Sequence, residues 1–572
     1  MPATGRSTPW HPPATSGRPR SPRSSLWPST ASGSGTAESS PTCGTSTASR
    51  HARAARRCAW SAFAHSTIRK RSPRASLVTA EAPVRCEVAV IGGGFGGSLL
   101  AMCLAAQGRE VVLLERDRHP RFRIGESSTP LANLILEDVS KRYGLDELIP
   151  LCRYGTWKHS YPELRCGPKR GFSFFAHEAG RPFERFPDHR NELLVAANPA
   201  EDVADTQWLR SDVDQFFAAT ARAHGVRVLE GLEVVGVERS EGWHLTLASH
   251  DSVSADFVID ASGGTSPLRN AVGLTDASQS LATRSRAVFS HFRGVARWDT
   301  ICPAAATDRA DYPFPADAAA LHHLTPDGWF WMLRFDHGVT SVGAVLTNAP
   351  PGGPAEQEWQ TLLERYPSVA AQMSEAEQIR PLVRTGRLQR RARPASGADW
   401  ALLPGAAYFI DPLLSPGNAH TMYGVDRLSR IFESWPDRAA MAAQLQDYDA
   451  RLQADIDFLD PLIHGCYRAL PTFPLLAAFT MYYFAGAIYS EERRRNGTAG
   501  EDDGFLHSHD RSFRRLVLAA YRDLLEVTSG PEGQSVDANV VDAFTKRVAS
   551  DIEPWNTTGL CHPARENMYR YG

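Results

Sequence analysis

Residues 88–98 read VAVIGGGFGGS, an apolar run that passes directly into a glycine-rich turn. The run from Val88 to Ile91 predicts a buried β-strand, and the Ala- and Leu-rich stretch from Ser98 to Ala106 predicts the helix that follows it. A second apolar strand, 111–114, is expected after Gly108 ends that helix. A strand, a glycine turn, a helix and a second strand in this order predict an α/β dinucleotide-binding fold.

Four residues in this segment have the chemistry that a dinucleotide needs. Gly92, Gly94 and Gly97 have G-x-G-x-x-G spacing. The first makes the tight turn, the second lets a pyrophosphate approach the backbone, and the third lets the helix pack closely on the strand. Glu115 ends the second strand, 23 residues after Gly92, where its carboxylate can accept hydrogen bonds from ribose hydroxyls. The pattern predicts a dinucleotide site and does not by itself distinguish FAD from NAD.

Two segments further along the chain favour FAD. Residues 256–264 (DFVIDASGG) are an apolar strand that ends in a small-residue turn, and residues 210–217 (RSDVDQFF) precede it. Both resemble segments of FAD-dependent hydroxylase-type proteins, in which the strand returns to the dinucleotide site. The resemblance implies cofactor contacts from Arg210, Asp260 and Asp411, the last fitting a carboxylate near the ribityl chain and pyrophosphate. FAD is therefore the predicted cofactor, in a Rossmann-like module of the hydroxylase type.

Residues 409–417 (FIDPLLSPG) carry most of the information on function. Pro, Ser and Gly in so short a span predict a turn that leads into a helix, beginning near Asn418. The free amides at the start of that helix would form a site for an anion or for the polar edge of a ring. The string has the form F-x-x-P-x-x-S-x-G, which resembles the motif that separates flavin-dependent halogenases from flavin monooxygenases. The resemblance implies active-site roles for Ser415 and Gly417.

The segment 328–334 (GWFWMLR) adds a second resemblance to this family. Trp329 and Trp331 alternate as residues on one face of a strand do. They resemble the W-x-W-x-I-P signature of flavin-dependent halogenases, although Leu333 and Arg334 replace its Ile-Pro. In the family the tryptophans line the passage between flavin and substrate. A plain sheet face remains the alternative explanation.

The resemblance implies a tryptophan-halogenase-like, FADH2-dependent enzyme. A separate flavin reductase supplies the reduced FAD, and oxygen and a halide ion are converted into hypohalous acid. The acid travels through the protein to a lysine, which positions it beside an electron-rich aromatic or pyrrolic carbon. The implied substrate is a small molecule or a carrier-tethered aromatic group.

Two lysines are candidates for this role, because the family's lysine follows a Gly-Glu segment, here 123–127 (RIGES), and precedes an aromatic strand. Lys158 ends the sequence GTWK and Lys169 begins KRGFSF. The K-x-G-x-x-F pattern of Lys169 resembles the phenol- and pyrrole-type halogenases, so Lys169 is preferred. An ammonium group suits the task, since it can hydrogen-bond an uncharged oxidant and its pKa shifts readily when it is buried.

Two positions depart from the tryptophan halogenases. The residue before the motif's serine is a glutamate there and is Leu414 here, which argues against free tryptophan and favours a phenol- or pyrrole-type substrate. The family's halide is held by the backbone amides of the two residues after the serine, yet Pro416 has no N–H. Only Gly417 keeps its donor, unless Asn418 or a side chain substitutes for the missing one.

Three function classes remain in view at this point. The preferred one is the halogenase just described, with Lys169, Trp329, Trp331 and Ser415 as catalytic residues. An FAD-dependent monooxygenase or a prenyl-chain reductase would need NAD(P)H to reduce its flavin directly, and the sequence has no second glycine motif for it. The third class is a non-catalytic flavin-binding relic whose halide site Pro416 has disabled.

Composition separates the first eighty residues from the rest. Residues 1–80 hold twelve Lys and Arg and one acidic residue, Glu38, and show no apolar periodicity, so a disordered basic tail rich in Ser, Pro and Arg is expected. The tail resembles an organellar transit peptide, or it is sequence upstream of a true start near Val78. We prefer the second interpretation. No aromatic-plus-basic platform follows the tail, which argues against nucleic-acid binding.

The remaining sequence predicts a compartment and a domain plan. Nine cysteines without a C-x-x-C pair fit the reducing cytoplasm and provide no zinc motif, so no metal is predicted. The longest apolar stretch, 475–489, is too short to span a bilayer. It is predicted to be a buried helix over a pocket, to which it would supply Phe479, Tyr482, Tyr483 and Phe484. A charged loop, 491–503, is expected to follow it. Residues 83–435 should form the FAD-binding module with an antiparallel substrate sheet, and 436–572 a helical C-terminal cap.

Overall fold

The computed structural model describes residues 84–571, apart from 265, 305–309, 348, 351, 501–502 and 531–535. The chain divides into two units, 1–74 and 75–572, and the second is the one described below. The tail predicted for residues 1–80 lies outside the described residues.

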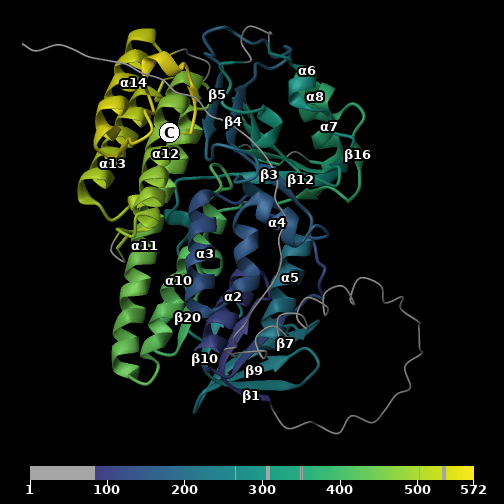
Figure 1. Cartoon of the computed structure of the whole chain (residues 1–572), viewed down its shortest axis with the longest axis vertical. Coiled ribbons are helices and arrows are strands. Elements are labelled where there is room, and N and C mark those ends of the chain that lie inside the picture. Colours follow the sequence, from purple (N-terminus) through teal and green to yellow (C-terminus); the bar gives the residue numbers. More distant parts are fainter. Residues whose placement is uncertain are drawn as a thin grey trace, which may run out of the picture. The chain divides into compact units, whose positions relative to one another are not determined.

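A largely parallel sheet forms the dinucleotide-binding layer (Figure 1). β1 (Val84–Ile91) lies between β10 (Ser252–Asp260) and β2 (Val111–Glu115), and the three strands run parallel. β2 is buried along its whole length, as expected of a strand with both faces covered. Helix α2 (Phe95–Ala106) begins just after β1, which confirms the predicted α/β fold. The same layer contains α3 (Pro130–Tyr143), α5 (Arg210–Ala223), β7 (Arg227–Glu230), β8 (Val234–Arg239), β9 (Trp243–Leu247), β19 (Ser396–Gly397) and β20 (Trp400–Leu402).

The predicted substrate sheet is present, in the order β16-β12-β15-β14-β13-β4-β5-β22, with β17 also paired to β12. Its centre is an antiparallel meander, and two parallel pairs, β13 with β4 and β5 with β22, are added to it. Parallel neighbours need long connections, and β4 and β13 are indeed distant in sequence. The strands are β4 (Gly171–Ala176), β5 (Glu192–Ala196), β12 (Arg286–Arg293), β13 (Ala320–Thr325), β14 (Gly328–Arg334), β15 (Val339–Leu346), β16 (Glu377–Gln378), β17 (Val383–Arg384) and β22 (Met568–Tyr569).

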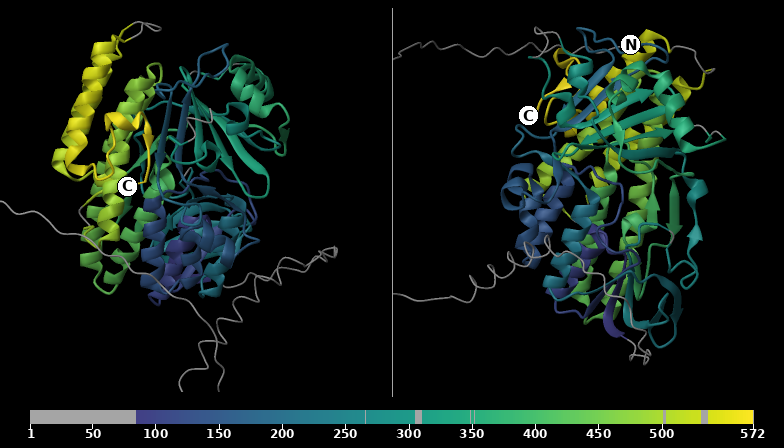
Figure 2. Two further views of the ribbon diagram at one scale, coloured as in Figure 1. Left: turned by 45° about the horizontal axis from the view of Figure 1, so that its top comes forward. Right: turned by 90° about the vertical axis from the view of Figure 1, so that its right-hand side faces the viewer.

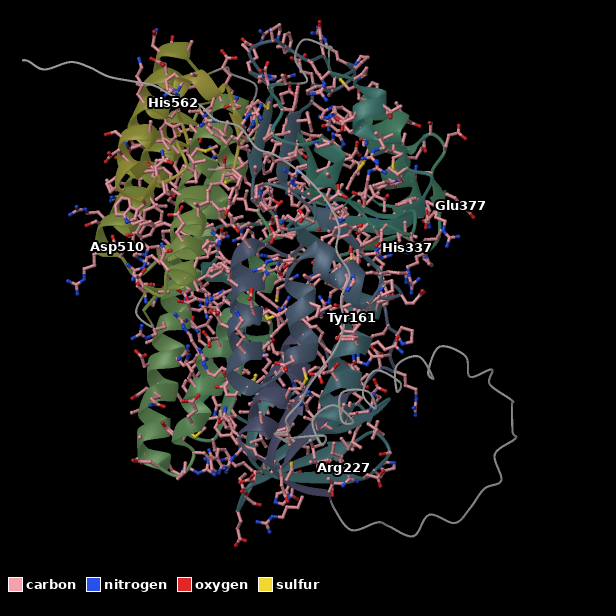
Figure 3. All side chains as sticks on the ribbon, viewed as in Figure 1. Tyr161, Arg227, His337, Glu377, Asp510 and His562 are labelled. Atoms are coloured by element: carbon pink, nitrogen blue, oxygen red, sulfur yellow. The ribbon has the colours of Figure 1, made fainter. Side chains whose placement is uncertain are left out.

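Short elements connect these layers and cover their faces. α7 (Ala355–Arg365) and α8 (Pro367–Met373) cover an apolar face of the substrate sheet, where Trp359 and Val369 belong to one core cluster with Phe330 of β14. Polar residues such as Arg227, Glu377 and His562 are exposed at the periphery (Figure 3). The other short elements are β3 (Cys166–Lys169), β6 (Asp205–Trp208), β11 (Thr275–Asp276), β18 (Arg390–Arg393), β21 (Tyr408–Phe409), α4 (Tyr154–Ser160), α6 (Trp298–Ile301) and α9 (Pro404–Ala407).

The chain becomes helical towards its C-terminus, as predicted. Asp437 caps the first long helix, since its side chain accepts from the backbone N–H groups of Ala439 and Ala440. Figures 1 and 2 show the long helices packed side by side, next to the two sheets. The last strand, β22, then returns to pair with β5 of the substrate sheet. The helices are α10 (Pro416–Ile431), α11 (Arg438–Ala469), α12 (Phe473–Arg495), α13 (Arg511–Val527) and α14 (Ala538–Ile552).

Helix α12 corrects one prediction. The charged loop expected from residue 491 begins later, because α12 continues to Arg495 and keeps Glu491 on its last turns. Glu and Arg are good helix formers, and arginines near a helix C-terminus interact favourably with its dipole. By length and composition α12 could cross a bilayer, with a mean hydropathy of 1.2 in its most apolar window, but 72% of that window is buried inside the protein.

Candidate active site

A cleft of about 760 Å³ lies at the carboxyl ends of β1, β2 and β10. Parallel strands deliver their following turns to one edge of a sheet, and α/β folds bind ligands in the crevice at that edge. Asp260, which was predicted to bind the cofactor, does not line this cleft: it is fully buried, and its Oδ1 accepts from the backbone N–H of Ser262 at 2.8 Å. The other predicted cofactor residues do line it: Gly92, Gly94, Gly97, Glu115, Arg210, Asp411 and Gly417.

The three glycines of the first motif are glycines for different reasons. Gly92 has a φ of +113°, and a Cβ on it would lie 2.5 Å from a backbone oxygen. A Cβ on Gly97 would lie 2.0 Å from the carbonyl oxygen of Gly92, so the protein's own packing requires both glycines. Gly94 has a φ of −73°, and the atoms nearest to an added Cβ are guanidinium nitrogens of Arg210 and Arg121, at 3.5 and 3.6 Å. Packing leaves room at Gly94, so a glycine there fits the approach of a ligand.

Two arginines face this opening, and carboxylates fix their positions. Arg121 donates to Asp214 and to Glu115, both at 2.9 Å. Arg210 donates to both carboxylate oxygens of Asp214 at 3.0 Å. Burial would raise the pKa of Asp214, but the guanidinium groups of Arg210 and Arg121 hold it below its ordinary value. Two fixed cations beside the N-terminus of α2 suit a pyrophosphate.

Glu115 supplies the acceptor for a ribose. It is 4% exposed, and its Oε2 accepts from the backbone N–H of Gly93 at 2.9 Å, while its Oε1 accepts from that of Asp117 at 3.0 Å. A carboxylate can accept about four hydrogen bonds, so Glu115 retains capacity for a hydroxyl. An open glycine turn, two cations and this acceptor together fit FAD, which would supply the redox chemistry when bound.

A short backbone segment leads from this cleft to a buried lysine. Gly125 lines the cleft, and the Nδ2 of Asn418, on α10, donates to the carbonyl oxygens of Gly125 and Ser127 at 3.1 and 3.3 Å. The next residue, Ser128, accepts from the Nζ of Lys169 at 2.5 Å. Because a chain extends by at most about 3.6 Å per residue, Ser128 lies within about 11 Å of Gly125 along this segment.

Lys169 ends β3 and is fully buried. Its register partner on β6 is Asp205, and its Nζ lies 4.0 Å from the centre of the Phe172 ring. Burial lowers the pKa of Lys169, and the negative charges of Asp205 and Glu491 oppose that shift. Burial likewise raises the pKa of Asp205. The ammonium therefore gives up its proton more readily than an exposed lysine does.

Lys158, the alternative lysine, lies elsewhere. It is on α4, its side chain is 31% exposed, and its Nζ forms an ion pair with Asp336 at 2.6 Å. It also donates to the carbonyl oxygen of Pro162. The structure therefore places Lys169, and not Lys158, beside the segment that leads from the cleft.

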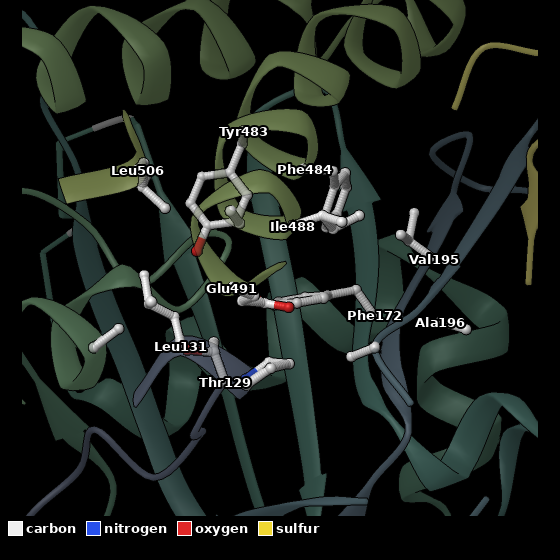
Figure 4. Close-up of a pocket in the computed structure, with 14 residues that line it drawn as sticks. Thr129, Leu131, Phe172, Val195, Ala196, Tyr483, Phe484, Ile488, Glu491 and Leu506 are labelled. Atoms are coloured by element: carbon white, nitrogen blue, oxygen red, sulfur yellow. The ribbon is translucent and has the colours of Figure 1, made fainter. Parts of the chain in front are cut away.

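A small apolar cavity lies between α12 and Phe172 (Figure 4), the residue whose ring Lys169 contacts. Its free volume is about 30 Å³. Phe172 separates the lysine from it, and α12 contributes Tyr483, Phe484 and Glu491. The prediction that α12 covers a pocket thus applies to two of its four predicted aromatic residues, whereas Phe479 and Tyr482 lie outside the cavity lining.

The amino-acid sequence matches known families and proteins in the same regions. Residues 207–471 match the tryptophan halogenase family, and residues 90–137 match the NAD(P)-binding Rossmann-like domain. Tetracycline 7-halogenase of Kitasatospora aureofaciens is 28% identical over 423 residues, which are 72% of this chain and 75% of that protein. Monodechloroaminopyrrolnitrin halogenase PrnC of Pseudomonas fluorescens is 28% identical over 71% of this chain and 72% of its own. Over most of its described length, the chain is thus similar to flavin-dependent halogenases.

The fold agrees with this assignment. The crystal structure of halogenase PltM in complex with phloroglucinol and FAD superposes with a TM-score of 0.76 at 24% identity, covering 84% of this chain and 98% of that one. Like these relatives, the chain is an FAD-dependent oxidoreductase. The cleft contains the glycine motif from which the sequence predicted FAD binding, and its lining fits that cofactor.

The two tryptophans lie in the middle of a row of contacting rings in this halogenase-like fold. Trp329 and Trp331 are 1% and 7% exposed and do not line the cleft or the cavity. The row begins at Phe122, whose sequence neighbours Arg121 and Arg123 line the cleft. It ends at Phe172, which contacts Lys169. Successive ring centres are 5.2 to 6.3 Å apart in the row Phe122, Phe289, Trp331, Trp329, His322 and Phe172.

Asp411 has a structural task beside its place in the cleft wall. Its Oδ2 accepts from the hydroxyl groups of Ser285 at 2.5 Å and Tyr467 at 2.9 Å, and its Oδ1 accepts from the N–H of Leu413. Tyr467, on α11, in turn accepts from the indole N–H of Trp329 at 2.9 Å. Burial raises the pKa of Asp411 to about 6, and its three donors oppose the rise. The carboxylate thus ties the turn of the halogenase motif to the substrate sheet and to the helices.

We expect Tyr467→Phe to lower the free energy of unfolding by about 1–3 kcal/mol, because it leaves a buried indole N–H unpaired and removes a donor from Asp411. Urea denaturation followed by tryptophan fluorescence measures the change. Tyr521→Phe is the matched control, since the hydroxyl of Tyr521 bonds the half-buried His464 at 2.8 Å. Equal losses in the two variants would contradict the role given to Tyr467.

The start of α10 contains the residues that the sequence predicted to bind the halide. Leu414 and Ser415 both adopt left-handed backbone, with φ of +64° and +56°, so the chain turns sharply before the helix. Ser415 does not line the cleft, whereas Pro416, Gly417 and Asn418 do. A Cβ on Gly417 would meet no atom within 4 Å, so its backbone is open to the cleft. Gly417, whose amide was predicted to be a donor, therefore lies in the open wall of this cleft.

Sequence reasoning missed several residues of the site. Arg121 lies six residues after Glu115, with which it forms a hydrogen bond. This short spacing could have indicated that Arg121 belongs to the site. Arg390 donates to the carbonyl oxygens of Gly263 and Gly405 in the cleft wall, and burial lowers its pKa to about 10. Its position depends on contacts between segments distant in the chain, which no local pattern reports.

Proposed function

We propose that this protein is an FADH2-dependent halogenase that uses O2 and a halide ion to halogenate an electron-rich aromatic or pyrrolic substrate. The observation that carries this proposal is the position of Lys169. Its buried ammonium lies at the end of the 125–128 segment from the FAD cleft and against Phe172, a wall of the apolar cavity. A flavin monooxygenase, whose oxygen is transferred next to the flavin, has no use for a buried lysine there.

In this proposal, residues of the cleft bind FAD, and Lys169 positions the oxidant next to the cavity. Arg121, Arg210 and Glu115 hold FAD, whose redox chemistry with oxygen oxidises the halide to hypohalous acid. Lys169 donates a hydrogen bond to that acid and keeps it next to the cavity. The halogen then bonds to a ring carbon, and the displaced ring proton and the hydroxide of the acid leave as water. The row of buried rings between the two places excludes water.

Three further features of the proposal follow from the family. A separate flavin reductase supplies FADH2, since the described fold offers one dinucleotide cleft. The substrate is a free phenol or pyrrole or its carrier-bound form; one relative is the 1H-pyrrole-2-carbonyl-[peptidyl-carrier protein] chlorinase of Pseudomonas fluorescens. The seven cysteines of the described segments are free, which fits a protein of the cytoplasm.

The test supplies the purified full-length protein with a flavin reductase, NADH, FAD, oxygen and either chloride or bromide. We expect mass spectrometry to find halogenated products from a panel of phenols and pyrroles, given free and as carrier thioesters. Omitting the reductase should stop the reaction. Hydroxylated products formed with NADPH alone would favour the monooxygenase, and oxygen consumption without any product would favour a relic.

A further inference from the structure

The cavity next to Lys169 contains one charged side chain, that of Glu491. Glu491 lies on α12, is 6% exposed, and its carboxylate stands beside the ring of Phe172 inside the cavity (Figure 4). The remaining lining is apolar except for Thr129 and the hydroxyl of Tyr483. A buried carboxylate in so apolar a wall is costly unless it has partners.

Glu491 has few such partners within the protein. Arg495, one turn further along α12, is 3.6 Å away and 34% exposed, which is too long for a hydrogen bond. Among the described residues, no hydrogen bond reaches the Glu491 carboxylate. Burial raises the pKa of Glu491 to about 8, with Asp205 adding to the rise and Arg495 and Lys169 opposing it. A carboxyl group that is buried in a cavity without hydrogen bonds, and whose pKa is raised, is a candidate for ligand binding.

The placement of Glu491 complements that of Lys169. The lysine touches one wall of the cavity, Phe172, and the charges of Lys169 and Glu491 interact. Leu414, which stands before the motif's serine, is fully buried and apolar, so it offers no acceptor to a substrate. Among the residues that line the cavity, Glu491 is the one carboxylate able to accept a hydrogen bond from a ring substituent.

We propose that Glu491 anchors the substrate by accepting a hydrogen bond from the O–H of a phenol or the N–H of a pyrrole, so that a ring carbon faces the oxidant held by Lys169. This inference rests on the proposed function and names the feature of the ring that the site selects. The free volume of about 30 Å³ holds one or two water molecules. A ring therefore enters by displacing apolar side chains of the wall, among them Phe484, Ile488 and Leu506.

A binding experiment tests the anchor without any turnover. Fluorine NMR titration compares 4-fluorophenol with 4-fluoroanisole, which has the same ring but no donor, on the wild type, Glu491→Gln and Glu492→Gln. Glu492 is the matched control: it neighbours Glu491 but accepts from Thr557 outside the cavity, at 2.7 Å. We expect the wild type and Glu492→Gln to bind the phenol about tenfold more tightly than the anisole, and Glu491→Gln to lose most of this preference. No preference in the wild type, or no phenol binding, would overturn the proposal.

The pH dependence of binding separates Glu491 from its neighbours. An ionised carboxylate is the stronger acceptor, so the phenol preference of the wild type should rise between pH 7 and pH 9, as Glu491 loses its proton. The charged groups that face it are Arg495 and Glu492 on α12, Lys169 on β3 and Asp205 on β6. Asp205→Asn should therefore move the midpoint of the rise to lower pH, and Glu491→Gln should remove the rise. A rise that persists in Glu491→Gln would contradict the proposal.

Bromination assays distinguish an error in the role of Glu491 from an error in the proposed halogenase function. With reductase, NADH, FAD, oxygen and bromide, monochlorodimedone traps hypobromous acid that escapes, while phenol and pyrrole report ring bromination. We expect Glu491→Gln to brominate the trap at the wild-type rate and the rings about tenfold more slowly. Wild-type protein that brominates neither trap nor ring would refute the proposed function, and the binding titration would still decide on Glu491. Unchanged ring bromination in Glu491→Gln would refute the anchor alone.

Thermal denaturation excludes a merely structural role. If the ion pair with Arg495 held α12 in place, Glu491→Gln would lower Tm. Because the folded-state pKa of Glu491 is raised from 4.5 to about 8, the folded protein binds the extra proton, and its stability falls as pH rises through this window. Glu491→Gln lacks this penalty, so we expect its Tm to equal that of the wild type near pH 5 and to exceed it at pH 9. A lower Tm for the variant at both pH values would support the structural role instead.

Discussion

Lys169→Ala abolishes ring halogenation while FAD binding and oxygen consumption continue; this is the largest effect that we expect at the lysine site. The flavin cleft lies at the other end of the 125–128 segment, so the halide is still oxidised and hypohalous acid escapes into solution. A positioned proton donor contributes about 10²–10⁴-fold to a rate, and we expect a loss of at least about a hundredfold in ring products. Product mass spectrometry, an oxygen electrode and the flavin absorbance measure the three quantities.

Two further variants keep this prediction decisive if Lys169→Ala folds poorly. Lys169→Met retains the volume of the buried stem and should show the same loss. Lys169→Arg should also fail, since a guanidinium stays protonated and has a different shape. Lys158→Ala is the control: its partner is Asp336 near the surface, and an exposed ion pair contributes less than about 1 kcal/mol. Loss of halogenation in Lys158→Ala but not in Lys169→Met would show that the other lysine is the functional one.

The parts of this site that the sequence predicted are those set by local rules. The turn at Gly92, the contact of Gly97 with the strand and the helix start near Asn418 each follow from the residues within a few positions, and the structure places the helix start at Pro416. Lys169 was preferred over Lys158 on a six-residue pattern, without knowledge of what either lysine touches. Local geometry is therefore readable from sequence, whereas the choice between two lysines needed the fold.

The parts that could not be predicted depend on contacts across the chain. Lys169 donates to Ser128, 41 residues away, and Trp329 to Tyr467, 138 residues away. Glu491 belongs to a run of charged residues, EERRR, which is usually a solvated segment. Its burial arises because α12 extends beyond its apolar part and carries Glu491 to the cavity. Asp260 was assigned to the cofactor because its strand returns to the cleft. It is the last residue of β10, and the cleft wall begins with the next residue, Ala261.

Gly94→Asp should remove FAD and leave the fold intact, which is the second large effect that we expect. Gly94 has an ordinary helix-entry conformation, with φ of −73° and ψ of 175°, and a Cβ there would meet no atom closer than 3.5 Å. The new carboxylate would lie next to the guanidinium groups of Arg210 and Arg121 and would occupy the place of the pyrophosphate. An internal anion that displaces and repels a ligand anion should raise the Kd for FAD by at least about a thousandfold, or about 4 kcal/mol.

Flavin absorbance of the purified variant measures the loss of FAD, and its Tm measures whether the fold is retained. Gly94→Ala is the uncharged control, and it should weaken FAD much less, because it adds a methyl group and no negative charge. Gly97→Ala should instead disturb the fold itself. Its Cβ would lie 2.0 Å from the carbonyl oxygen of Gly92, so we expect a lower yield of folded protein. A Gly94→Asp protein that is purified yellow, with full flavin content, would show that the pyrophosphate does not bind at this turn, and the assignment of the cleft to FAD would fail with it.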